Sequence, residues 1–287
     1  MRTIEKENIP TSLQEIPEPP TRLYIEGELP NAEHFIYLAV VGSRRYSNYG
    51  REACEHLIAG LSGSPIVIVS GLAHGIDALA HRAALSAKLP TVAFPGSGLD
   101  RRSLYPRSNI GLADEILAAG GALVSEFEPM TRGALHTFPR RNRLMAGISR
   151  AVLVVEAGER SGTLITARLA IEYNRDLFTV PGSIFSEHSI GAHRLLRHGA
   201  VPITTSADLL LELGIENKRN ASPLVDGLTI NECRVLEALH EPLERDALLR
   251  TLPMPIAEAN ALLMTMEIRG LISESVGRFR KTNNAIQ

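Results

Sequence analysis

An arginine-rich segment with one aromatic residue gives the most direct indication of chemistry in this sequence. The segment HTFPRRNRLMAGISR, residues 136–150, places Phe138 and Asn142 among four arginines, which are Arg140, Arg141, Arg143 and Arg150. An aromatic ring can stack on a nucleobase of any identity, and guanidinium groups neutralise phosphates. The segment therefore predicts a surface for single-stranded nucleic acid. The alternative is a charged helix start that only faces solvent.

A second candidate for phosphate binding follows the first apolar strand, in VVGSRR at residues 40–45. Gly42 and Ser43 let backbone amides approach an anion at the start of the next helix, and Arg44 or Arg45 adds positive charge. The motif is not GxGxxG, and no acidic residue closes the second strand to hold a ribose. These two departures argue against a dinucleotide site. A turn with solvated arginines is the alternative.

A third helix start carries small hydroxylated residues, in EAGERSGTLITA at residues 156–167. Ser161, Gly162 and Thr163 immediately precede a helical segment. A serine or threonine at this position caps the helix, and the free amides of its first turn form an anion site. Capping alone would explain the two hydroxyls, but three such helix starts on one sheet edge favour a shared anion site.

Two more loops are expected at the same edge of the sheet. The loop SGLAHGID contains Gly71, together with His74, interpreted as a turn residue, and Asp77, interpreted as a helix cap or the partner of an arginine. The next loop, residues 95–109, either lines a path for a strand or is a long solvated connection; its candidate side chains are Arg101, Arg102, Tyr105 and Arg107. No paired carboxylates, Ser/His/Asp set or metal-ligand spacing accompanies these motifs. The sequence therefore predicts no catalytic residue, no metal and no cofactor.

The elements that position these loops repeat one pattern between residues 35 and 214. Short apolar runs begin at Phe35, Pro65, Thr91, Ala122, Ala151 and Asp176. They are apolar almost throughout, as strands buried on both faces must be. Helical periodicity separates them at residues 49–61, 76–87 and 163–173. The alternation predicts an α/β fold with a parallel, doubly wound sheet, in which ligands bind at the carboxyl ends of the strands.

The flanking regions differ from this pattern. Residues 1–34 contain IPEPP and are expected to form an extended N-terminal lead-in against the main domain at 35–216. A polar linker is expected at 217–227. Residues 228–287 then predict a winged-helix domain: a capping box at Thr229 and Glu232, three helices, and a hairpin around Gly277. Ile256, Ala259, Leu263 and Met266 are expected on one face of the third helix.

Composition limits the class of protein. The chain has 287 residues, 44% hydrophobic residues and a formal net charge of −2. The charge is uneven, because residues 41–200 hold 18 Lys and Arg against 13 Asp and Glu. No apolar run approaches the roughly 20 residues needed to cross a bilayer. No secretory signal is recognisable, and Cys54 and Cys233 form no disulfide framework, so a cytoplasmic protein without membrane contact is expected.

The order of the motifs resembles the DNA-processing protein A family (DprA/Smf) over roughly residues 10–214. The succession is VGSRR, SGLAHGID, FPGSGLD with YPRSN, SEF, FPRRNR, SGTLITA and VPG, and the region after 228 is similar to that family's winged helix. The resemblance implies an extended Rossmann-like domain that binds single-stranded DNA, protects incoming DNA and loads the RecA recombinase in natural transformation. It assigns a DNA-binding role to Gly42, Ser43, Arg44, Arg45, Gly71, Phe138, Arg140, Arg141, Asn142, Arg143, Ser161, Gly162 and Thr163. One departure is His193, where asparagine is expected in the family.

The resemblance also implies a homodimer and a recombinase contact near the end of the main domain. The segment SADLLLELGI, residues 206–215, has too many leucines for one narrow buried stripe, so at least one leucine is expected to face outward. The predicted partner surface consists of Leu209, Leu210 and Leu213. The alternative is that all the leucines of this segment pack inside.

Two other classes of function stay open at this point. One is a nucleoside-monophosphate-cleaving hydrolase of the lysine-decarboxylase-like Rossmann group, which would need a carboxylate at the pocket, with Glu156 or Glu126 as candidates. The other is a transcriptional regulator acting through the winged helix. Its third helix carries Glu258 and Glu267 against only Arg269, which is poor for phosphate contacts.

Overall fold

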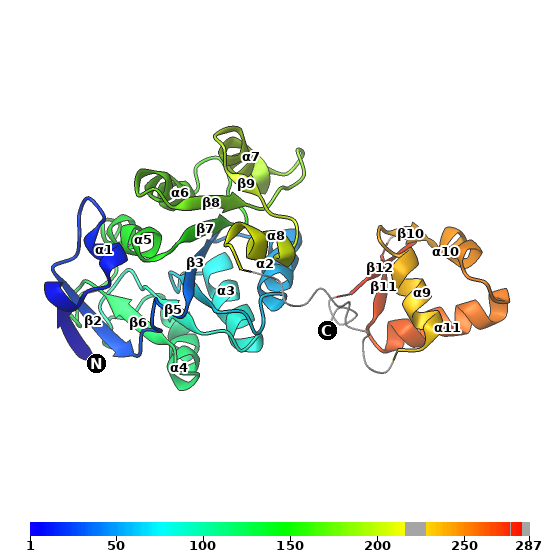
Figure 1. Cartoon of the computed structure of the whole chain (residues 1–287), viewed down its shortest axis with the longest axis horizontal. Coiled ribbons are helices and arrows are strands. Elements are labelled where there is room, and N and C mark those ends of the chain that lie inside the picture. The colour runs from blue at the N-terminus through cyan, green and yellow to red at the C-terminus, as the bar shows by residue number, and fades with distance from the viewer. Residues whose placement is uncertain (216–227, 276, 283–287) are drawn as a thin grey trace. The chain divides into compact units, whose positions relative to one another are not determined.

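The computed structural model describes residues 1–215, 228–275 and 277–282, so the expected linker at 217–227 lies outside the described residues. The chain divides into two compact units, whose described parts are residues 1–215 and residues 228–282 without 276. Figure 1 shows the elements of each unit. No helix in the described ranges is long and apolar enough to cross a membrane.

The first unit is built on a nine-stranded sheet in the order β1-β2-β6-β5-β4-β3-β7-β8-β9. The pairs from β6 through β9 are parallel, whereas β1 with β2 and β2 with β6 are antiparallel. The strands are β1 (Arg2–Glu5), β2 (Arg22–Gly27), β3 (Ile36–Val41), β4 (Ile66–Ser70), β5 (Thr91–Ala93), β6 (Ala122–Ser125), β7 (Ala151–Val154), β8 (Asp176–Thr179) and β9 (Val201–Pro202). The α/β class and all six predicted strands are confirmed.

The N-terminal segment is more structured than an extended lead-in. It contributes β1, β2, a 3-10 turn at Lys6–Asn8 and a short helix, α1 (Thr11–Gln14), which packs against α5. Strand β2 extends the sheet because Leu23 and Ile25 are buried on one face while Tyr24 is buried on the other. Only three consecutive apolar residues mark this strand, and prolines precede it, so its sequence signal is weak.

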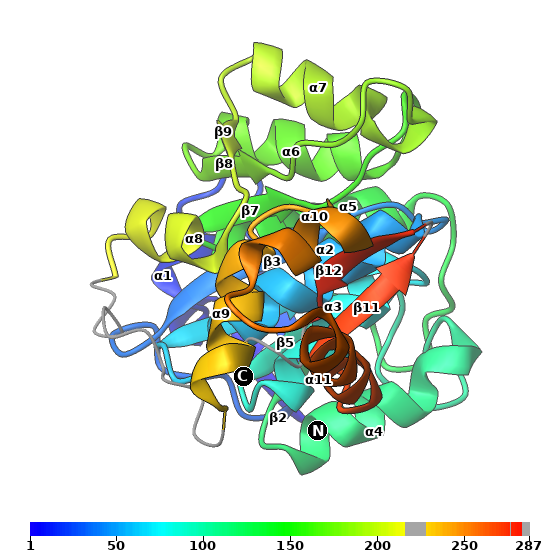
Figure 2. The same cartoon turned by 90° about the vertical axis from the view of Figure 1, so that its right-hand side faces the viewer.

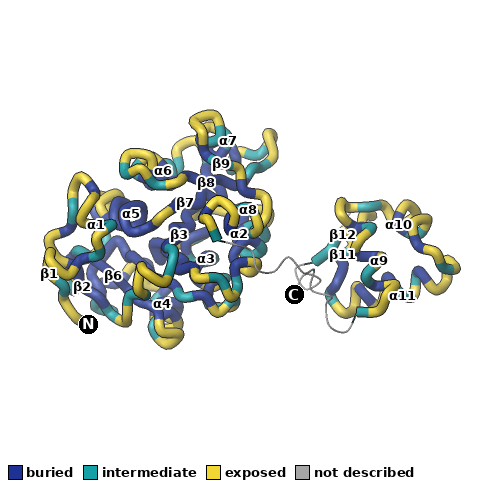
Figure 3. Tube along the Cα trace, viewed as in Figure 1, coloured by how far each residue is buried: buried dark blue, intermediate teal, exposed yellow. Residues whose placement is uncertain are grey.

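Two helical layers cover the sheet. The helices are α2 (Asn48–Ala59), α3 (Ile76–Ser86), α4 (Ile110–Ala118), α5 (Thr137–Ile148), α6 (Thr163–Glu172), α7 (Ile190–Arg197) and α8 (Ser206–Glu212). Helices α1, α5, α6 and α7 pack on the face that carries Tyr37, Ala39 and Val41, and α2, α3 and α8 pack on the face with Leu38 and Val40. Both faces are covered, so successive residues of β3 are all apolar. Figure 3 shows the strands buried between the exposed outer surfaces of the helices.

Strands β3, β4 and β7 are neighbours and parallel, so their carboxyl ends share one edge of the sheet. The loops that follow them begin at Gly42, Gly71 and Val155, and each leads into a helix. The predicted binding loops therefore do meet at one edge, as open α/β sheets require. Figures 1 and 2 both show α6 beside β8 and α7 near β9, at the end of the sheet away from β2.

The second unit has the predicted helices and hairpin. These are α9 (Ile230–Ala238), α10 (Arg245–Thr251), α11 (Ile256–Ile268), β11 (Ile272–Ser275) and β12 (Arg278–Lys281), with an additional short strand β10 (Leu243–Glu244) on β12. The capping box of Thr229 and Glu232 is present. Ala259, Leu263 and Met266 are buried as predicted, but Ile256 is 69% exposed. Ile256 is the first residue of α11, and Leu252 and Met254, which precede the helix, supply the apolar side chains of this core instead.

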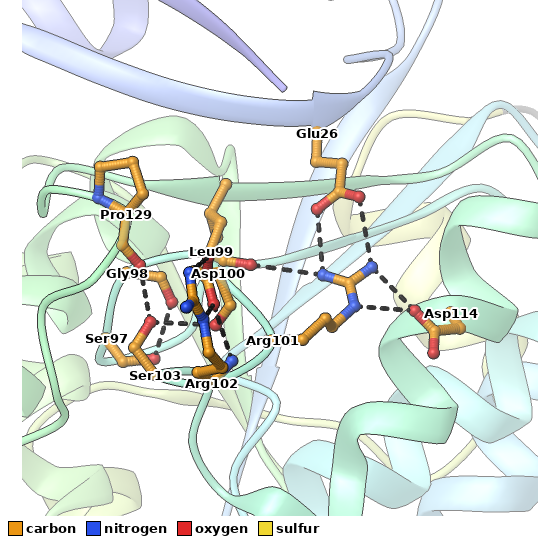
Figure 4. Close-up of polar contacts among 10 residues, drawn as sticks. All are labelled: Glu26, Ser97, Gly98, Leu99, Asp100, Arg101, Arg102, Ser103, Asp114 and Pro129. Carbon is orange, nitrogen blue, oxygen red and sulfur yellow. Dashed lines mark hydrogen bonds and ion pairs between the residues drawn. The ribbon is translucent and has the colours of Figure 1, made fainter.

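The loop before α4 contains arginines that are bound to carboxylates of the same unit. Arg101 donates to Glu26 at 3.0 and 3.2 Å and to Asp114 at 3.0 Å, which joins β2 to α4. Arg102 donates to Asp100 at 3.0 Å. Figure 4 shows both sets of contacts. Of the two interpretations of this loop, the paired guanidinium groups of Arg101 and Arg102 favour a structural connection over a path for a strand.

Replacing Arg101 should therefore destabilise the first unit. Hydrogen bonds to charged groups contribute about 1.5–3 kcal/mol each, so we expect Arg101→Ala to lower the free energy of unfolding by about 2 kcal/mol. Arg102→Ala is the matched control, since a pair between near neighbours at the surface contributes at most about 1 kcal/mol. Urea unfolding followed by circular dichroism measures both variants. Equal losses would contradict a special role for Arg101.

Candidate functional site

A pocket of about 620 Å³ opens at the carboxyl ends of β3, β4 and β7. Three chain segments supply most of its wall: the turn after β3, the first two turns of α5, and the loop that leads into α6. The lining residues are Val41, Gly42, Ser43, Arg44, Arg45, Ala73, Asp77, Leu135, Phe138, Pro139, Arg141, Asn142, Met145, Gly158, Arg160, Ser161, Gly162, Thr163, Ile165, Thr166 and His188.

The turn after β3 is held tightly by its own hydrogen bonds. The Ser43 amide donates to the Glu156 carbonyl at 2.9 Å, and the Ser43 hydroxyl accepts from the Arg45 amide at 3.1 Å. A Cβ on Gly42 would lie 2.6 Å from the side chain of Ile76, so no larger residue fits there. This turn leaves Arg44 and Arg45 exposed at the mouth of the pocket.

The aromatic ring of Phe138 lies under one of these arginines. The Arg44 guanidinium carbon is 5.2 Å from the centroid of the Phe138 ring, and the Tyr105 ring centroid is 5.7 Å from it. Gly96 allows this packing, since a Cβ there would lie 2.4 Å from the Phe138 ring. The ring is half-buried, so its position is fixed while part of it stays open to the pocket. An arginine over an aromatic face is a favourable cation–π arrangement.

Arg141 forms the floor of the pocket and is almost fully buried. Its Nη1 donates to the carbonyl oxygens of Gly71 and Phe94, and its Nε donates to Asn142 Oδ1 at 3.1 Å. A Cβ on Gly71 would lie 2.0 Å from Arg141 Nη1 and 2.5 Å from Asp77 Oδ2, so only glycine fits between them. Burial lowers the pKa of Arg141 to about 10, against the attraction of Asp77, and the guanidinium stays charged at neutral pH.

Asp77 is the carboxylate that faces this guanidinium. Its Oδ2 accepts from the Gly71 amide at 3.1 Å, and burial raises its pKa while Arg141 and the backbone amides oppose that rise. Asp77 thus partners an arginine, one of the two roles expected for it. His74 is exposed and lies outside the pocket lining.

The start of α6 supplies the opposite wall. The Thr163 amide donates to Ser161 Oγ at 3.3 Å, and the Ser161 hydroxyl donates to Thr163 Oγ1 at 2.9 Å. Gly162 is exposed, and a Cβ there would meet nothing within 4 Å. The amides of Thr163, Leu164 and Ile165 already donate to Ser161 and Gly162, so the exposed Arg160 beside them is the group of this wall that suits an anion.

Two arginines expected in the pocket are elsewhere. Arg143 is buried and donates to Glu126 Oε2 at 2.5 Å and to the Glu18 carbonyl, so it anchors the N-terminal segment. Arg140 pairs with the same carboxylate at 3.2 Å. Their DNA-binding role stays a prediction, but neither lines the pocket, so the pocket wall does not include them. The reason is helical period: Phe138, Arg141, Asn142 and Met145 share one face of α5, and Arg140 and Arg143 lie off that face.

The carboxylates considered for hydrolysis are also used elsewhere. Glu156 accepts from the Ser47 amide at 2.9 Å and from its hydroxyl at 2.5 Å, at the start of α2. Glu126 is held by Arg143. Asp77 is the only acidic side chain among the described residues that line the pocket. No cluster of metal-ligand type occurs in the described ranges.

The leucines predicted at a partner surface lie in the core. Leu209, Leu210 and Leu213 are buried with Leu57 and its neighbours of α2, which corrects their assignment to the surface. Leu211 faces outward and is 76% exposed. The general expectation that at least one leucine of this helix is exposed is therefore confirmed, but at a different residue. On a helix the exposed position follows from phase, which four nearly consecutive leucines do not reveal.

Some lining residues were not identified from the sequence. Leu135, Arg160, Ile165 and His188 complete the wall. Arg160 was recognisable as the residue before Ser161 in EAGERSGT. Leu135 is 90% exposed one turn before Phe138, and isolated apolar residues in a loop carry no periodic signal. His193, the departure from the family pattern, binds the Gly182 carbonyl through Nε2 at 3.0 Å.

Comparison with known proteins identifies relatives of both units. Residues 1–214 match the family described as DNA recombination-mediator protein A, and residues 219–278 match the DprA winged helix domain. Protein Smf of Escherichia coli (strain K12) is 43% identical over 209 residues, which is 73% of this chain and 55% of that protein. The DNA processing protein DprA of Streptococcus pneumoniae is 43% identical over 203 residues, 71% of this chain and 70% of that protein. This chain therefore spans about half the length of the Escherichia coli relative.

Solved structures give the same relationship. The X-ray structure of DNA processing protein A from Streptococcus pneumoniae has a TM-score of 0.68 and 40% identity, covering 74% of each chain. DNA processing protein A from Helicobacter pylori has a TM-score of 0.66 and 30% identity, covering 74% of this chain and 96% of that one. The latter structure was described for its single-stranded DNA binding mode. The family resemblance predicted from the order of motifs is confirmed.

The different environments of two arginines predict different responses to substitution. Arg143→Ala removes the buried partner of Glu126 and leaves this buried carboxylate with only the exposed Arg140, so we expect a loss of about 3 kcal/mol in the free energy of unfolding. Arg44→Ala removes an exposed side chain and should change it by less than about 1 kcal/mol. Urea denaturation separates the two. A stable Arg143→Ala variant would contradict the structural role of Arg143.

Proposed function

Because the chain belongs to the DNA recombination-mediator protein A family, we propose that it binds single-stranded DNA in the pocket at the carboxyl ends of β3, β4 and β7. We propose further that it is not an enzyme, that it protects incoming DNA, and that it hands the strand to the RecA recombinase. The proposal assumes a cytoplasmic protein. The Helicobacter pylori relative, whose structure was described for its single-stranded DNA binding mode, supports the choice of ligand.

The observation that carries this proposal is the set of arginines at the pocket. Arg44, Arg45 and Arg160 line it, all three are exposed, and none forms an ion pair with a described carboxylate. Four arginines outside the pocket, Arg101, Arg102, Arg140 and Arg143, are instead paired with acidic side chains. A phosphate chain is the kind of ligand that can neutralise three guanidinium groups left without acidic partners.

The shape of the pocket favours a single strand over a duplex. Phe138 offers a fixed ring on which an unpaired base can stack, and bases inside a duplex are already stacked. Duplex readers insert a helix or ribbon into a groove of the DNA. The pocket instead is a hollow of about 620 Å³ lined by loops and helix starts.

The hydrolase alternative is less well supported. It requires a carboxylate poised at the ligand, but Asp77 is buried beside Arg141, and Glu126 and Glu156 are bound to other groups. The regulator alternative is also weak, because the exposed surface of α11 carries Ile256, Met264 and Ile268 rather than cations. Assays of nucleotide hydrolysis test the first of these directly.

A salt titration tests the proposed ligand. We expect tighter binding of a single-stranded oligonucleotide than of the matching duplex, with little dependence on base sequence. Affinity should fall with salt at a log–log slope of about −0.7 per phosphate neutralised. Fluorescence anisotropy in a salt series measures both quantities. Equal affinity for the two forms of DNA would contradict the proposal.

We propose that the protein forms a homodimer and that Leu211 lies at the contact between the two copies, because it is the exposed leucine of α8. An isolated large apolar side chain is not itself an interface, so Leu211 would act with its neighbours. We expect Leu211→Glu to shift the protein towards monomer in multi-angle light scattering. Ile171→Glu, on the exposed surface of α6, is the matched control. The proposed contact would be contradicted if the wild-type protein is a monomer at tens of micromolar, or if the Leu211→Glu variant is still a dimer.

A further inference from the structure

The loop between β8 and α7 exposes two large apolar side chains. Phe185 is 91% exposed and Ile184 is 79% exposed, although the rest of the loop, residues 181–189, is small or polar. A phenylalanine ring left in water offers apolar area that a ligand can cover. The ring of Phe185 has no role in the packing of the described core.

Hydrogen bonds fix the backbone that presents this ring. The Tyr49 hydroxyl donates to the Pro181 carbonyl at 2.5 Å, and His193 Nε2 lies 3.0 Å from the Gly182 carbonyl oxygen. Within the loop, the Phe185 amide donates to Ser183 Oγ at 3.2 Å. The backbone at Phe185 is thus held in place, so binding would have to order only the torsions of its side chain.

The same loop reaches the pocket at its other end. His188 lines the pocket, and its carbonyl accepts from the Ala157 amide at 3.0 Å. A Cβ built on Gly158 would lie 3.5 Å from the Glu187 carbonyl, so the loop packs against the pocket wall. Phe185 and His188 are three positions apart in the chain, which limits the distance between their Cα atoms to about 11 Å.

We propose that Phe185 is a second stacking residue, on which a base of single-stranded DNA rests where the strand leaves the pocket across the Gly158–Ser161 wall. The inference rests on the proposed function and deepens it. Arg160 lines the pocket two residues after Gly158, where the loop packs, and it is exposed without an ion pair to any described acid, so it can meet a phosphate there. Glu159 on the same wall is neutralised by Arg194 at 2.6 Å.

The size of the apolar surface favours a base over a protein partner. A stable protein interface buries about 800 Å² on each side, with an anchor in a packed centre. One phenylalanine and one isoleucine fall well short of that area, since an aromatic side chain buries about 150–250 Å². Stacking on a base needs only one ring, and every base has a face that fits it.

Oligonucleotides of two lengths test this role in the full-length protein. We choose oligothymidines of about 4 and about 16 nucleotides, the range of site sizes seen in single-strand binding folds. Phe185→Ala should weaken binding of the long oligonucleotide roughly 5- to 150-fold, the range expected for the loss of one stacked base, and should leave the short one unchanged. Phe185→Tyr should bind both like the wild type, and Phe185→Leu should behave like Phe185→Ala. Thermal melting checks that all variants fold.

Each other outcome overturns the inference. No effect at either length excludes a DNA contact at Phe185, and an equal loss at both lengths assigns the residue to the pocket or the fold. Wild-type affinity of Phe185→Leu for the long oligonucleotide indicates an apolar contact instead of base stacking. If the wild-type protein binds neither oligonucleotide, the proposed function fails. If the wild-type protein binds DNA and Phe185→Ala binds it with the same affinity, only the proposed stacking role of Phe185 is excluded, and the proposed function stands.

Discussion

The buried guanidinium of Arg141 is the interaction on which the arrangement of the pocket depends. It donates to carbonyl oxygens directly after β4 and β5, and Asp77 compensates its charge at the same place. A buried charge without such partners would be strongly destabilising. These contacts join α5 to the sheet edge and fix the rotation of the helix. The fixed rotation directs Phe138 and Asn142 into the pocket.

The same rotation separates two kinds of arginine that look equivalent in the sequence. Arg140 and Arg143 point away from the pocket and meet Glu126, and Arg143 also donates to the Glu18 carbonyl and so holds the N-terminal segment against the domain. Arg44 and Arg160 stand at the mouth without a described acidic partner. In the proposed function, the cations without acidic partners bind the ligand, whereas the paired ones stabilise the fold.

The sequence predicted the sheet and the meeting of its loops well, because continuous apolar runs and helix starts are local signals. It did not predict β2, whose three apolar residues follow prolines, or the tie between Arg101 and Glu26, which joins residues far apart in the chain. It also assigned Arg143 to the DNA site and Leu209 to the partner surface, although both are buried elsewhere. In both cases the sequence did not reveal which side of the helix faces inward. Helix phase is decided by tertiary contacts such as those of Arg141, and local spacing in an arginine-rich or leucine-rich run does not contain it.

The central claim is that uncompensated arginines of the pocket neutralise phosphates of a single strand. The most direct measurement is the salt dependence of oligothymidine affinity for Arg44→Ala, with Arg168→Ala, an exposed arginine of α6 outside the pocket lining, as control. The account predicts that Arg44→Ala reduces the magnitude of the log–log slope by about 0.7, one phosphate contact, and that Arg168→Ala leaves it unchanged. An unchanged slope for Arg44→Ala, in a protein that still folds, would contradict it.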